Sequence, residues 1–294
     1  MTNASPTSPS VIVGISTYNR ADVLPKAIRS AFEQSHKPLR VAVIDDASTD
    51  ATPALQSNFP QVSWQRWDQN CGYVNARNTM MLNAPEDYYV SLDDDAWFLQ
   101  EDEIAVAVDY LEKHPKVAAV AFDIVTPDEP QQSPRGRKSS VAMFIGCGHV
   151  LRLSVVKALA GYAKFPGRYG VEEKDLCLRL IDAGYEIVKF DGVHVWHDKT
   201  MTARDIPKNH RSGVCNDFTL TVWRFPGRIL VQMLVWKFIA HLRFAAKFGL
   251  VRACLQGMRD FSCSFVAAWR NRRPVRYESI MLYTTLTRSP RERV

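Results

Sequence analysis

Three consecutive carboxylates, Asp93, Asp94 and Asp95, follow directly after the apolar segment 88–92. Like charges in a row repel one another, so a fold gains from them mainly where a cation binds. Mg²⁺ and Mn²⁺ prefer oxygen ligands and are usually held by one or two carboxylates together with substrate phosphates. The run therefore indicates a divalent metal that carries a diphosphate, and a solvated acidic turn is the alternative for such a run on its own.

The first 125 residues read as strands that alternate with helices. Strands are expected at 11–15, 41–44, 62–67, 88–92 and 117–124, and helices at 23–32, 49–57, 72–82 and 104–111. This alternation predicts an α/β fold, with a mostly parallel sheet between helices. Ligands of such sheets bind beyond the carboxyl ends of the strands. Polar clusters follow three of the strands, at 17–20, 45–50 and 93–95, so we expect them at one edge of the sheet.

The second half of the chain changes in character. Residues 126–140 are rich in Pro, Ser and Arg and predict an exposed loop. An apolar strand is expected at 143–150, interrupted by Gly146 and Gly148. A helix is predicted at 172–182 and a strand at 186–190. After about residue 201 the segments become long, basic, aromatic and helical.

Composition suggests three regions: a disordered lead at 1–10, an α/β domain at 11–203 and a basic, aromatic-rich helical extension at 204–294. The lead lacks the basic start and apolar run of a signal peptide. The extension has 17 Lys+Arg and 5 Asp+Glu, a balance of +12, against −6 for the other 203 residues. The six cysteines are widely spaced, which favours buried free thiols in a reducing cytosol over zinc sites or disulfides.

Several short motifs occur in a fixed order along residues 10–200. Taken together they resemble the family 2 glycosyltransferases with the GT-A fold. The matching segments are VIVGISTYNR at 11–20, DDASTD at 45–50, NCGYVNARN at 70–78, LDDD at 92–95, GY at 161–162, EEKDLCLR at 172–179, and His197. Each motif alone is weak, whereas their order along one chain is specific. The C-terminal 90 residues match no such motif.

The resemblance implies transfer of a sugar from a nucleotide-diphosphate donor, with inversion at the anomeric carbon. Asp45 would accept from a pyrimidine N3–H, and Asp93 would address the ribose or metal-bound waters. Arg77 would reach the base or a phosphate, with a surface ion pair as the alternative. UDP or dTDP sugars are expected by resemblance alone. The donor-binding residues implied in this way are Thr17, Tyr18, Asn19, Arg20, Asp45, Asp46, Asn70, Gly72, Arg77, Asp93 and Asp94.

The same resemblance implies a metal site and a general base. Asp95 is expected as a direct ligand of Mg²⁺ or Mn²⁺. His197 is preferred to His194 as its partner, because the hydroxyls of Thr200 and Thr202 follow it.

Members of the family usually carry an Asp as base where this chain has Glu173, which is one methylene longer. Glu173 is therefore the expected base and Asp175 the reserve candidate. Acids at a helix N-terminus can also serve the helix dipole alone.

Residues 228–251 predict a helix with apolar residues at 4-3-4-3 spacing on one face. Lys237, His241, Arg243 and Lys247 interrupt it, so it is a poor membrane-spanning segment. It would lie on an anionic membrane or pack on the catalytic domain. We expect a cytoplasmic protein, peripheral on the inner face of the membrane, and no nucleic-acid partner, since no matching motif is present.

Two other function classes remain open at this stage. A nucleotidyltransferase would need a Gly-rich, Lys-bearing loop after the first strand, where this chain has Thr17 to Arg20. A catalytically inactive protein that binds a glycan or a membrane would not need Asp95 and Glu173. A dinucleotide dehydrogenase is disfavoured because Gly-x-Gly-x-x-Gly is absent from the first strand region. The expected acceptor is a hydroxyl of a glycan or of a lipid-linked sugar, as in polysaccharide biosynthesis.

Overall fold

The computed structural model describes residues 8–198 and 205–293, and the chain divides into two units. The first, here called the sheet unit, comprises residues 1–161, 185–200 and 290–294. The second, the helical unit, comprises 162–184 and 201–289. This division differs from the predicted boundary at 203–204. Segment 162–184 joins the C-terminal helices because its helix packs against two of them.

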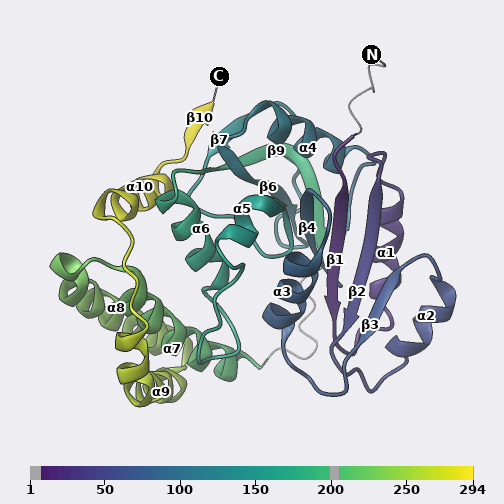
Figure 1. The fold of residues 1–294 in the computed structure, drawn as a ribbon. Coiled ribbons are helices and arrows are strands. Elements are labelled where there is room, and N and C mark those ends of the chain that lie inside the picture. The colour runs from purple at the N-terminus through teal and green to yellow at the C-terminus, as the bar shows by residue number, and fades with distance from the viewer. Residues whose placement is uncertain (1–7, 199–204, 294) are drawn as a thin grey trace. The chain divides into compact units, whose positions relative to one another are not determined.

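The sheet unit is built on a ten-stranded sheet, counted over the described residues, in the order β10-β7-β9-β6-β8-β4-β1-β2-β3, with β5 paired to β9. Figure 1 shows β1, β2 and β3 side by side. The strands are β1 Val11–Thr17, β2 Leu39–Asp45, β3 Ser63–Arg66, β4 Tyr88–Asp93, β5 Ala96–Phe98, β6 Val117–Val125, β7 Lys138–Ser140, β8 Gly148–Arg152, β9 Glu186–His197 and β10 Arg291–Arg293.

The predicted α/β class is confirmed, and the sheet is mixed. Strands β3, β2, β1 and β4 run parallel, as expected from the alternating pattern. Strand β8 is antiparallel to both β4 and β6, while β9 runs parallel to β6. The short strands β5, β7 and β10 are antiparallel to their partners. Strand β8 thus separates two parallel groups, which periodicity along the chain does not reveal.

The helices of the sheet unit follow the predicted pattern closely. They are α1 Leu24–Phe32, α2 Leu55–Asn58 preceded by a 3-10 turn at Thr52–Ala54, α3 Tyr73–Asn83, α4 Glu103–Lys113 and α5 Leu153–Ala158. The predicted strand at 143–150 is wrong in its first half. The backbone turns there, since Gly148 N donates to the Ile145 carbonyl at 3.4 Å and His149 Nδ1 donates to it at 2.8 Å.

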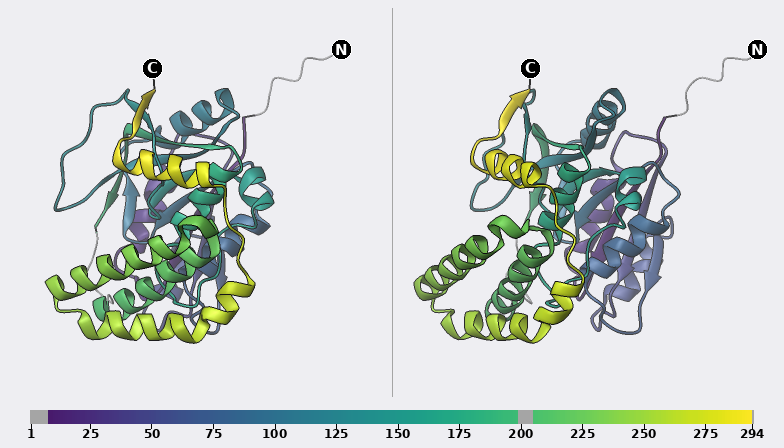
Figure 2. Two further views of the ribbon diagram at one scale, coloured as in Figure 1. Left: turned by 90° about the vertical axis from the view of Figure 1, so that its left-hand side faces the viewer. Right: turned by 60° about the vertical axis from the view of Figure 1, so that its left-hand side comes forward.

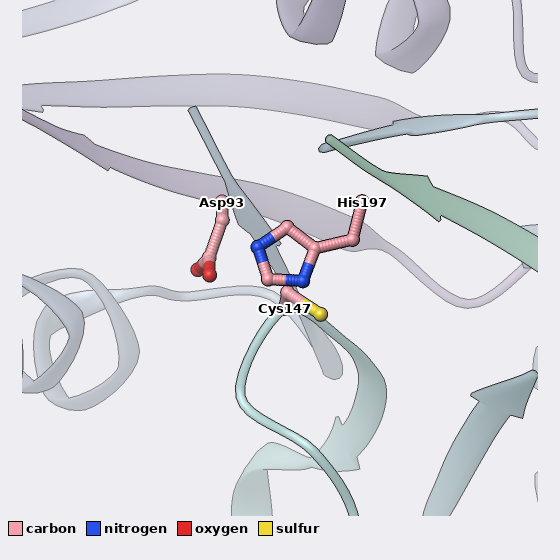
Figure 3. Close-up of side chains that lie close together, drawn as sticks. All are labelled: Asp93, Cys147 and His197. Atoms are coloured by element: carbon pink, nitrogen blue, oxygen red, sulfur yellow. The ribbon is translucent and has the colours of Figure 1, made fainter. Parts of the chain in front are cut away.

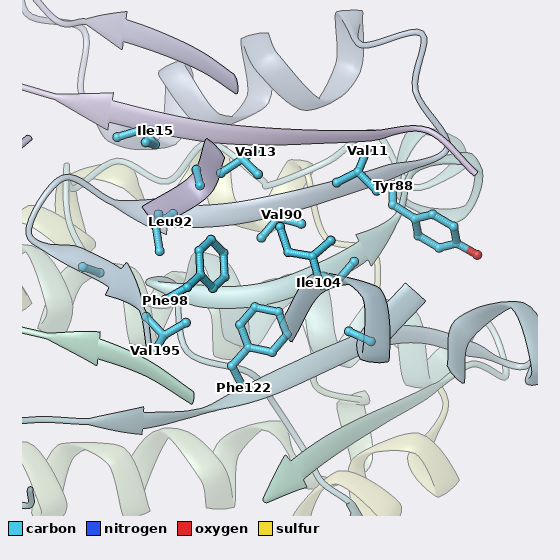
Figure 4. Close-up of a cluster of buried hydrophobic side chains, with 14 of the residues drawn as sticks. Val11, Val13, Ile15, Tyr88, Val90, Leu92, Phe98, Ile104, Phe122 and Val195 are labelled. Carbon is cyan, nitrogen blue, oxygen red and sulfur yellow. The ribbon is translucent and has the colours of Figure 1, made fainter. Parts of the chain in front are cut away.

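Side chains from both groups of parallel strands form the main core of the sheet unit (Figure 4). Val11, Val13 and Ile15 alternate on one face of β1, as the two-residue period of a strand requires. Gly14 points to the opposite face, where a Cβ would lie 2.4 Å from Cε2 of the buried Tyr89 ring. A glycine is therefore needed in β1 so that Tyr89 can fill this space.

The helical unit contains α6 Glu172–Asp182, α7 Ile206–Arg224, α8 Gly227–Phe248, α9 Val251–Arg270 and α10 Tyr277–Arg288. Asp205 is the N-cap of helix α7, and its side chain accepts a hydrogen bond from Lys208 N. Gly249 follows the last residue of helix α8 and caps it in a left-handed conformation, with a φ of 69°. Figure 2 shows α7, α8 and α9 as long helices, and both α8 and α9 contact α7. By length and composition, α8 is apolar enough to cross a membrane, with only 11% of its most apolar window buried.

Candidate active site

The strand register places the three predicted polar clusters at one edge of the sheet. Thr17, the last residue of β1, pairs with Asp45 at the end of β2. On the other side of β1, Ser16 pairs with Asp93 at the end of β4. Because these three strands are parallel, their carboxyl ends coincide and the loops that follow begin from the same line.

The loops after β1 and β2 are joined by hydrogen bonds. Asn19 N donates to Ser48 Oγ at 2.9 Å, and Asn19 Oδ1 accepts from Thr49 N at 2.7 Å. Asn19 adopts a φ of 54°, which asparagine tolerates better than most residues. Thr17 is buried, whereas Tyr18 is 40% exposed. Tyr18 is therefore accessible to a ligand above the edge, while Asn19 holds the loop.

The two adjacent carboxylates after β2 have different surroundings. Asp46 accepts from the backbone N–H groups of Cys71 at 2.6 Å and Gly72 at 2.7 Å, and Asn70 donates to its carbonyl at 3.3 Å. Asp46, Asn70 and Gly72 thus build the turn that starts α3. Asp45 accepts from Ser48 N at 2.9 Å through Oδ1, whereas its buried Oδ2 accepts no hydrogen bond from any described residue.

Arg77 is buried on α3 and donates to Asp93 Oδ1 at 2.5 Å. Its guanidinium also lies over the Tyr73 ring, 5.0 Å from the centroid. Arg77 therefore forms an ion pair, as weighed from the sequence, but with its own side chain buried and that of Asp93 28% exposed. The pair holds the first carboxylate of the acidic run, at the cost of desolvating the guanidinium.

Arg20 approaches the other two carboxylates of the run. Its guanidinium lies 3.9 Å from Asp94 and 3.9 Å from Asp95, and its backbone N donates to Thr52 Oγ1 at 3.0 Å. Burial and the neighbouring Asp95 raise the pKa of Asp94 to about 7, although Arg20 opposes this shift. The three carboxylates of the run face two arginines, Arg77 and Arg20, so the run is not fully balanced when all three are ionised, which favours a bound cation.

Asp95 and His197 meet because β5 pairs with β9 directly after the acidic run. Ala96 is the register partner of His197, and His197 Nε2 lies 3.2 Å from Asp95 Oδ1. His197 Nε2 is buried and has no hydrogen-bond partner within 8–198 and 205–293. His194, the alternative candidate, is buried and lies 3.0 Å through Nε2 from the Ser133 carbonyl. The hydroxyls of Thr200 and Thr202 lie outside the described residues.

Another side chain, Cys147, lies beside His197 and Asp93 (Figure 3). Ligand atoms of Asp93, Cys147 and His197 all lie within 4.8 Å of one another. Burial and the nearby carboxylates of Asp93 and Asp95 raise the pKa of the Cys147 thiol well above its usual range. Sequence reasoning missed this residue, since an isolated cysteine has no spacing signal. Its only local mark is the pair of glycines, Gly146 and Gly148, on either side of it.

The expected acceptor-side residues lie at the start of α6 in the helical unit. Val171, the residue before the helix, has a φ of 72°, a left-handed conformation that is unfavourable for a β-branched side chain. Asp175 is fully buried and accepts from Arg179 Nε at 2.7 Å and from Arg224 Nε at 2.5 Å. Glu173 is partly exposed. Two arginines thus hold Asp175 in place, whereas Glu173 is accessible.

Comparison with known proteins identifies the family. The sequence profile of glycosyl transferase family 2 matches residues 12–158, half of the chain. The chain belongs to glycosyl transferase family 2. This family 2 chain is 38% identical over 89 residues to the succinoglycan biosynthesis protein ExoO of Rhizobium meliloti. The match covers 30% of the chain and only 26% of that relative.

A longer match links this family 2 chain to the putative glycosyltransferase EpsE of Bacillus subtilis. The two are 29% identical over 191 residues, which cover 60% of the chain and 67% of the relative.

Solved structures support the GT-A fold of this family 2 chain. S. aureus TarS in complex with UDP-GlcNAc has a TM-score of 0.65 at 14% identity, covering 86% of the chain and 80% of TarS. A mannosyltransferase of Pyrobaculum calidifontis in complex with GDP-Man and Mn²⁺ has a TM-score of 0.59 at 18% identity, covering 95% of the chain and 80% of that protein. At these identities the likeness shows the fold alone.

Proposed function

We propose that this family 2 chain is an inverting, metal-assisted glycosyltransferase that moves a sugar from a nucleotide-diphosphate donor to a hydroxyl of a glycan or lipid-linked acceptor. The observation that carries the proposal is the buried Asp95–His197 pair at the carboxyl edge of the sheet. Its histidine nitrogen lies 3.2 Å from a carboxylate oxygen and has no hydrogen-bond partner among the described residues.

The residues around Asp95 fit a hard divalent cation. A carboxylate oxygen of Asp95 and Nε2 of His197 lie 3.2 Å apart, so one ion could be bound by both side chains. Mg²⁺ and Mn²⁺ prefer oxygen ligands to a thiol such as that of Cys147, and Asp93 is engaged by Arg77. Asp95 and His197 would therefore hold Mg²⁺ or Mn²⁺. When bound, such an ion neutralises charge that develops on the leaving diphosphate.

Asp45 is proposed to recognise the base of the donor. Its buried Oδ2 lies 3.8 Å from Arg66 Nε but accepts no hydrogen bond from the described residues, and the N3–H of a uracil or thymine ring would supply one. Burial removes the carboxylate oxygen from water at a cost in free energy. An N–H group of a bound ligand that donates a hydrogen bond to this oxygen would offset that cost. The proposal favours UDP or dTDP sugars. Asn19 and Asp46 would support the pocket indirectly, by holding the loops that form it.

Glu173 is proposed as the general base. Its carboxylate would take the proton of the acceptor hydroxyl as that oxygen forms a bond to the anomeric carbon. The bond from the anomeric carbon to the diphosphate oxygen breaks in the same displacement, and the nucleoside diphosphate leaves with that electron pair. This single displacement inverts the anomeric centre. The alternative base, Asp175, would first have to be released from Arg179 and Arg224.

The relatives suggest the pathway class. Proteins named for succinoglycan and colanic acid biosynthesis are among those that match the chain. We infer that the acceptor is a growing polysaccharide unit and that the protein acts in the cytoplasm, where nucleotide sugars are available.

To test the proposed function, the protein is incubated with each of a panel of nucleotide sugars, and the release of nucleoside diphosphate is measured. We expect turnover with a UDP or dTDP sugar and Mn²⁺ or Mg²⁺, and loss of several kcal/mol of transition-state stabilisation in Asp95→Ala, which is at least a hundred-fold in rate. Asp109→Ala, an exposed carboxylate of α4, is the matched control and should keep full activity. Full activity of Asp95→Ala, or of the native protein in excess chelator, would contradict the metal role.

A further inference from the structure

Helix α8 carries large apolar side chains on its outward side as well as on the side that packs inside the helical unit. Val231, Val235 and Ile239 follow at four-residue spacing and are 72%, 53% and 37% exposed. On the inward side, Leu230, Leu234 and Ala245 pack in the core of the helical unit. Lys237 and His241 lie on the same side and face α7. A helix on the surface of a soluble protein normally turns its apolar face inward.

The charged side chains on the inward side of α8 share one carboxylate as their ion-pair partner. Asp217 of α7 lies 2.6 Å from Lys237 Nζ and 3.1 Å from His241 Nε2, and Lys174 Nζ also lies 3.1 Å from it. These contacts favour the observed rotation of α8 about its axis, together with the packing of Leu230, Leu234 and Ala245. Turning the exposed apolar row inward would remove both sets of contacts, so this row stays on the outside.

The same character continues on α9, which is connected to α8 through Gly249 and Leu250. Large exposed apolar side chains are concentrated on the two helices, far beyond the scattered single residues that are ordinary on a soluble surface. On α8 and α9 they are Val231, Val235, Trp236, Phe238, Ile239, Phe244, Phe248, Val251, Leu255, Phe265, Val266 and Trp269.

Basic side chains border the apolar rows. Arg243 and Lys247 on α8 and Arg252, Arg259 and Arg270 on α9 are all exposed. The region 204–294 carries 17 Lys+Arg and 5 Asp+Glu, a balance of +12. Apolar rows bordered by cations match the chemistry of a surface that offers hydrocarbon below a layer of negative charge.

We propose that the outward faces of α8 and α9 dock on an anionic phospholipid bilayer, with α8 lying in the plane of the interface. Trp236, Val235 and Ile239 enter the headgroup–acyl boundary, and the arginines and lysines contact lipid phosphates. A lipid-linked acceptor would then be confined to the same plane as the enzyme.

The contacts of α8 favour lying in the interface over crossing the bilayer. With 22 residues, α8 has the length and apolarity to cross by composition. A crossing would bring Lys237 and His241 into hydrocarbon, together with Asp217 or without it, at high cost. An in-plane helix keeps this inward cluster inside the protein.

Charge also favours a bilayer over a second copy of the chain as the occupant of this face. A symmetric dimer through α8 and α9 would bring the same basic rows, including Arg243 and Arg252, together across the contact. Like charges that face one another across an interface oppose association. An anionic lipid surface turns the same charges into an attraction.

The test is co-sedimentation of the full-length chain with phosphatidylcholine vesicles that contain or lack phosphatidylglycerol, at low and high salt. We expect binding only with phosphatidylglycerol, and about a five-fold weaker affinity for each charge removed in Arg243→Gln and Lys247→Gln. Trp236→Ser with Ile239→Ser should weaken binding about ten-fold or more at either salt concentration. Leu82→Ser is the matched control, since Leu82 of α3 is also 37% exposed, and it should bind normally.

The depth of Trp236 in the bilayer is measured by quenching of tryptophan fluorescence with brominated phospholipids. The difference between the native chain and Trp236→Phe gives the Trp236 component. Bromine near the headgroup should quench the Trp236 component more than bromine deep in the acyl chain.

Equal binding to both vesicle types, unchanged binding of the double serine variant, or stronger quenching from the deep position would overturn the proposal. Conversion of a dimer to a monomer by the double variant, without vesicle binding by the native chain, would assign the face to a second copy instead.

Discussion

At the scale of single residues, the site depends on how neighbouring carboxylates differ in their surroundings. The side chain of Asp46 accepts hydrogen bonds from two backbone N–H groups. The buried Oδ2 of Asp45 accepts no hydrogen bond from the described residues. Asp93 is paired with Arg77, whereas Asp95 meets His197. Under the proposed function, Asp46 and Asp93 would support the site, while Asp45 and Asp95 would contact the donor or the metal.

The proposed base makes a prediction at this scale. Glu173→Gln should keep donor binding and lose transfer by about 10²–10⁴-fold, because glutamine preserves the shape of the side chain but cannot accept the proton. The rate of sugar transfer and the affinity for the donor are both measured for this variant and compared with those of the native protein.

Asp175→Asn separates the two candidates. It should lower the unfolding temperature, since Arg179 and Arg224 lose a charged partner in a buried position. Loss of transfer in Asp175→Asn with an unchanged unfolding temperature, and an active Glu173→Gln, would move the base to Asp175.

At the scale of elements, close packing between strands restricts β1 to glycine at position 14. We expect Gly14→Ala to destabilise the sheet unit by about 1–3 kcal/mol, because its Cβ would meet the buried Tyr89 ring at 2.4 Å. Chemical denaturation measures the difference. Gly213→Ala on α7 is the matched control, since its Cβ meets nothing within 4 Å, and it should be neutral or stabilising.

Packing between helices α6, α7 and α8 rests on a buried charge cluster. Asp217→Asn would leave the ammonium groups of Lys174 and Lys237 near each other without their shared carboxylate. We expect a loss of about 3–5 kcal/mol in the free energy of unfolding near neutral pH. Asp260→Asn, which breaks an exposed pair with Arg211, should cost less than about 1 kcal/mol.

The pH dependence of this cluster has a definite sign. The nearby cations, Lys174 first among them, outweigh burial and hold the pKa of Asp217 far below its ordinary value of 3.8. A carboxyl group with a lower pKa in the folded state stabilises the protein fully above its unfolded pKa, and this contribution falls as the pH drops below it. The difference between native protein and Asp217→Asn should therefore be largest above about pH 4 and shrink in stronger acid. A difference that grows on acidification would contradict this assignment.

At the scale of the whole molecule, ligand binding should be visible as stability. A donor product held at 100 times its dissociation constant adds about 2.7 kcal/mol to the folded state, or roughly 5–10 °C in the unfolding temperature of a unit of this size. We expect this shift with UDP or dTDP plus Mn²⁺, and little with GDP, if Asp45 reads the pyrimidine N3–H. A larger shift with GDP than with UDP would contradict the pyrimidine preference.

Charge is also distributed on the scale of the whole chain, with +12 in residues 204–294 and −6 elsewhere. The acidic part contains the edge of the sheet, where a cation is expected, and the basic part contains the helices with exposed apolar rows. This distribution of charge agrees with the two partners proposed above, a metal-bound nucleotide for the acidic part and an anionic surface for the basic part.

The sequence by itself determined the α/β class, most element positions and the family. Periodicity and strand-end clusters are local properties, and parallel strands bring their carboxyl ends together whatever the details of packing. For this reason the clusters at 17–20, 45–50 and 93–95 were correctly expected at one edge.

Only the tertiary structure decided which partner each polar side chain has. The pairing of Arg77 with Asp93, the approach of Cys147 to His197, and the turn that shortens β8 all join residues distant in the chain or depend on packing around them. The rotation of α8 is the clearest case. Its spacing predicts an apolar face, but α8 is apolar on more than one side. Which side faces outward depends on the packing of Leu230 and Ala245 and on the ion pairs with Asp217, and such contacts through space leave no period in the sequence.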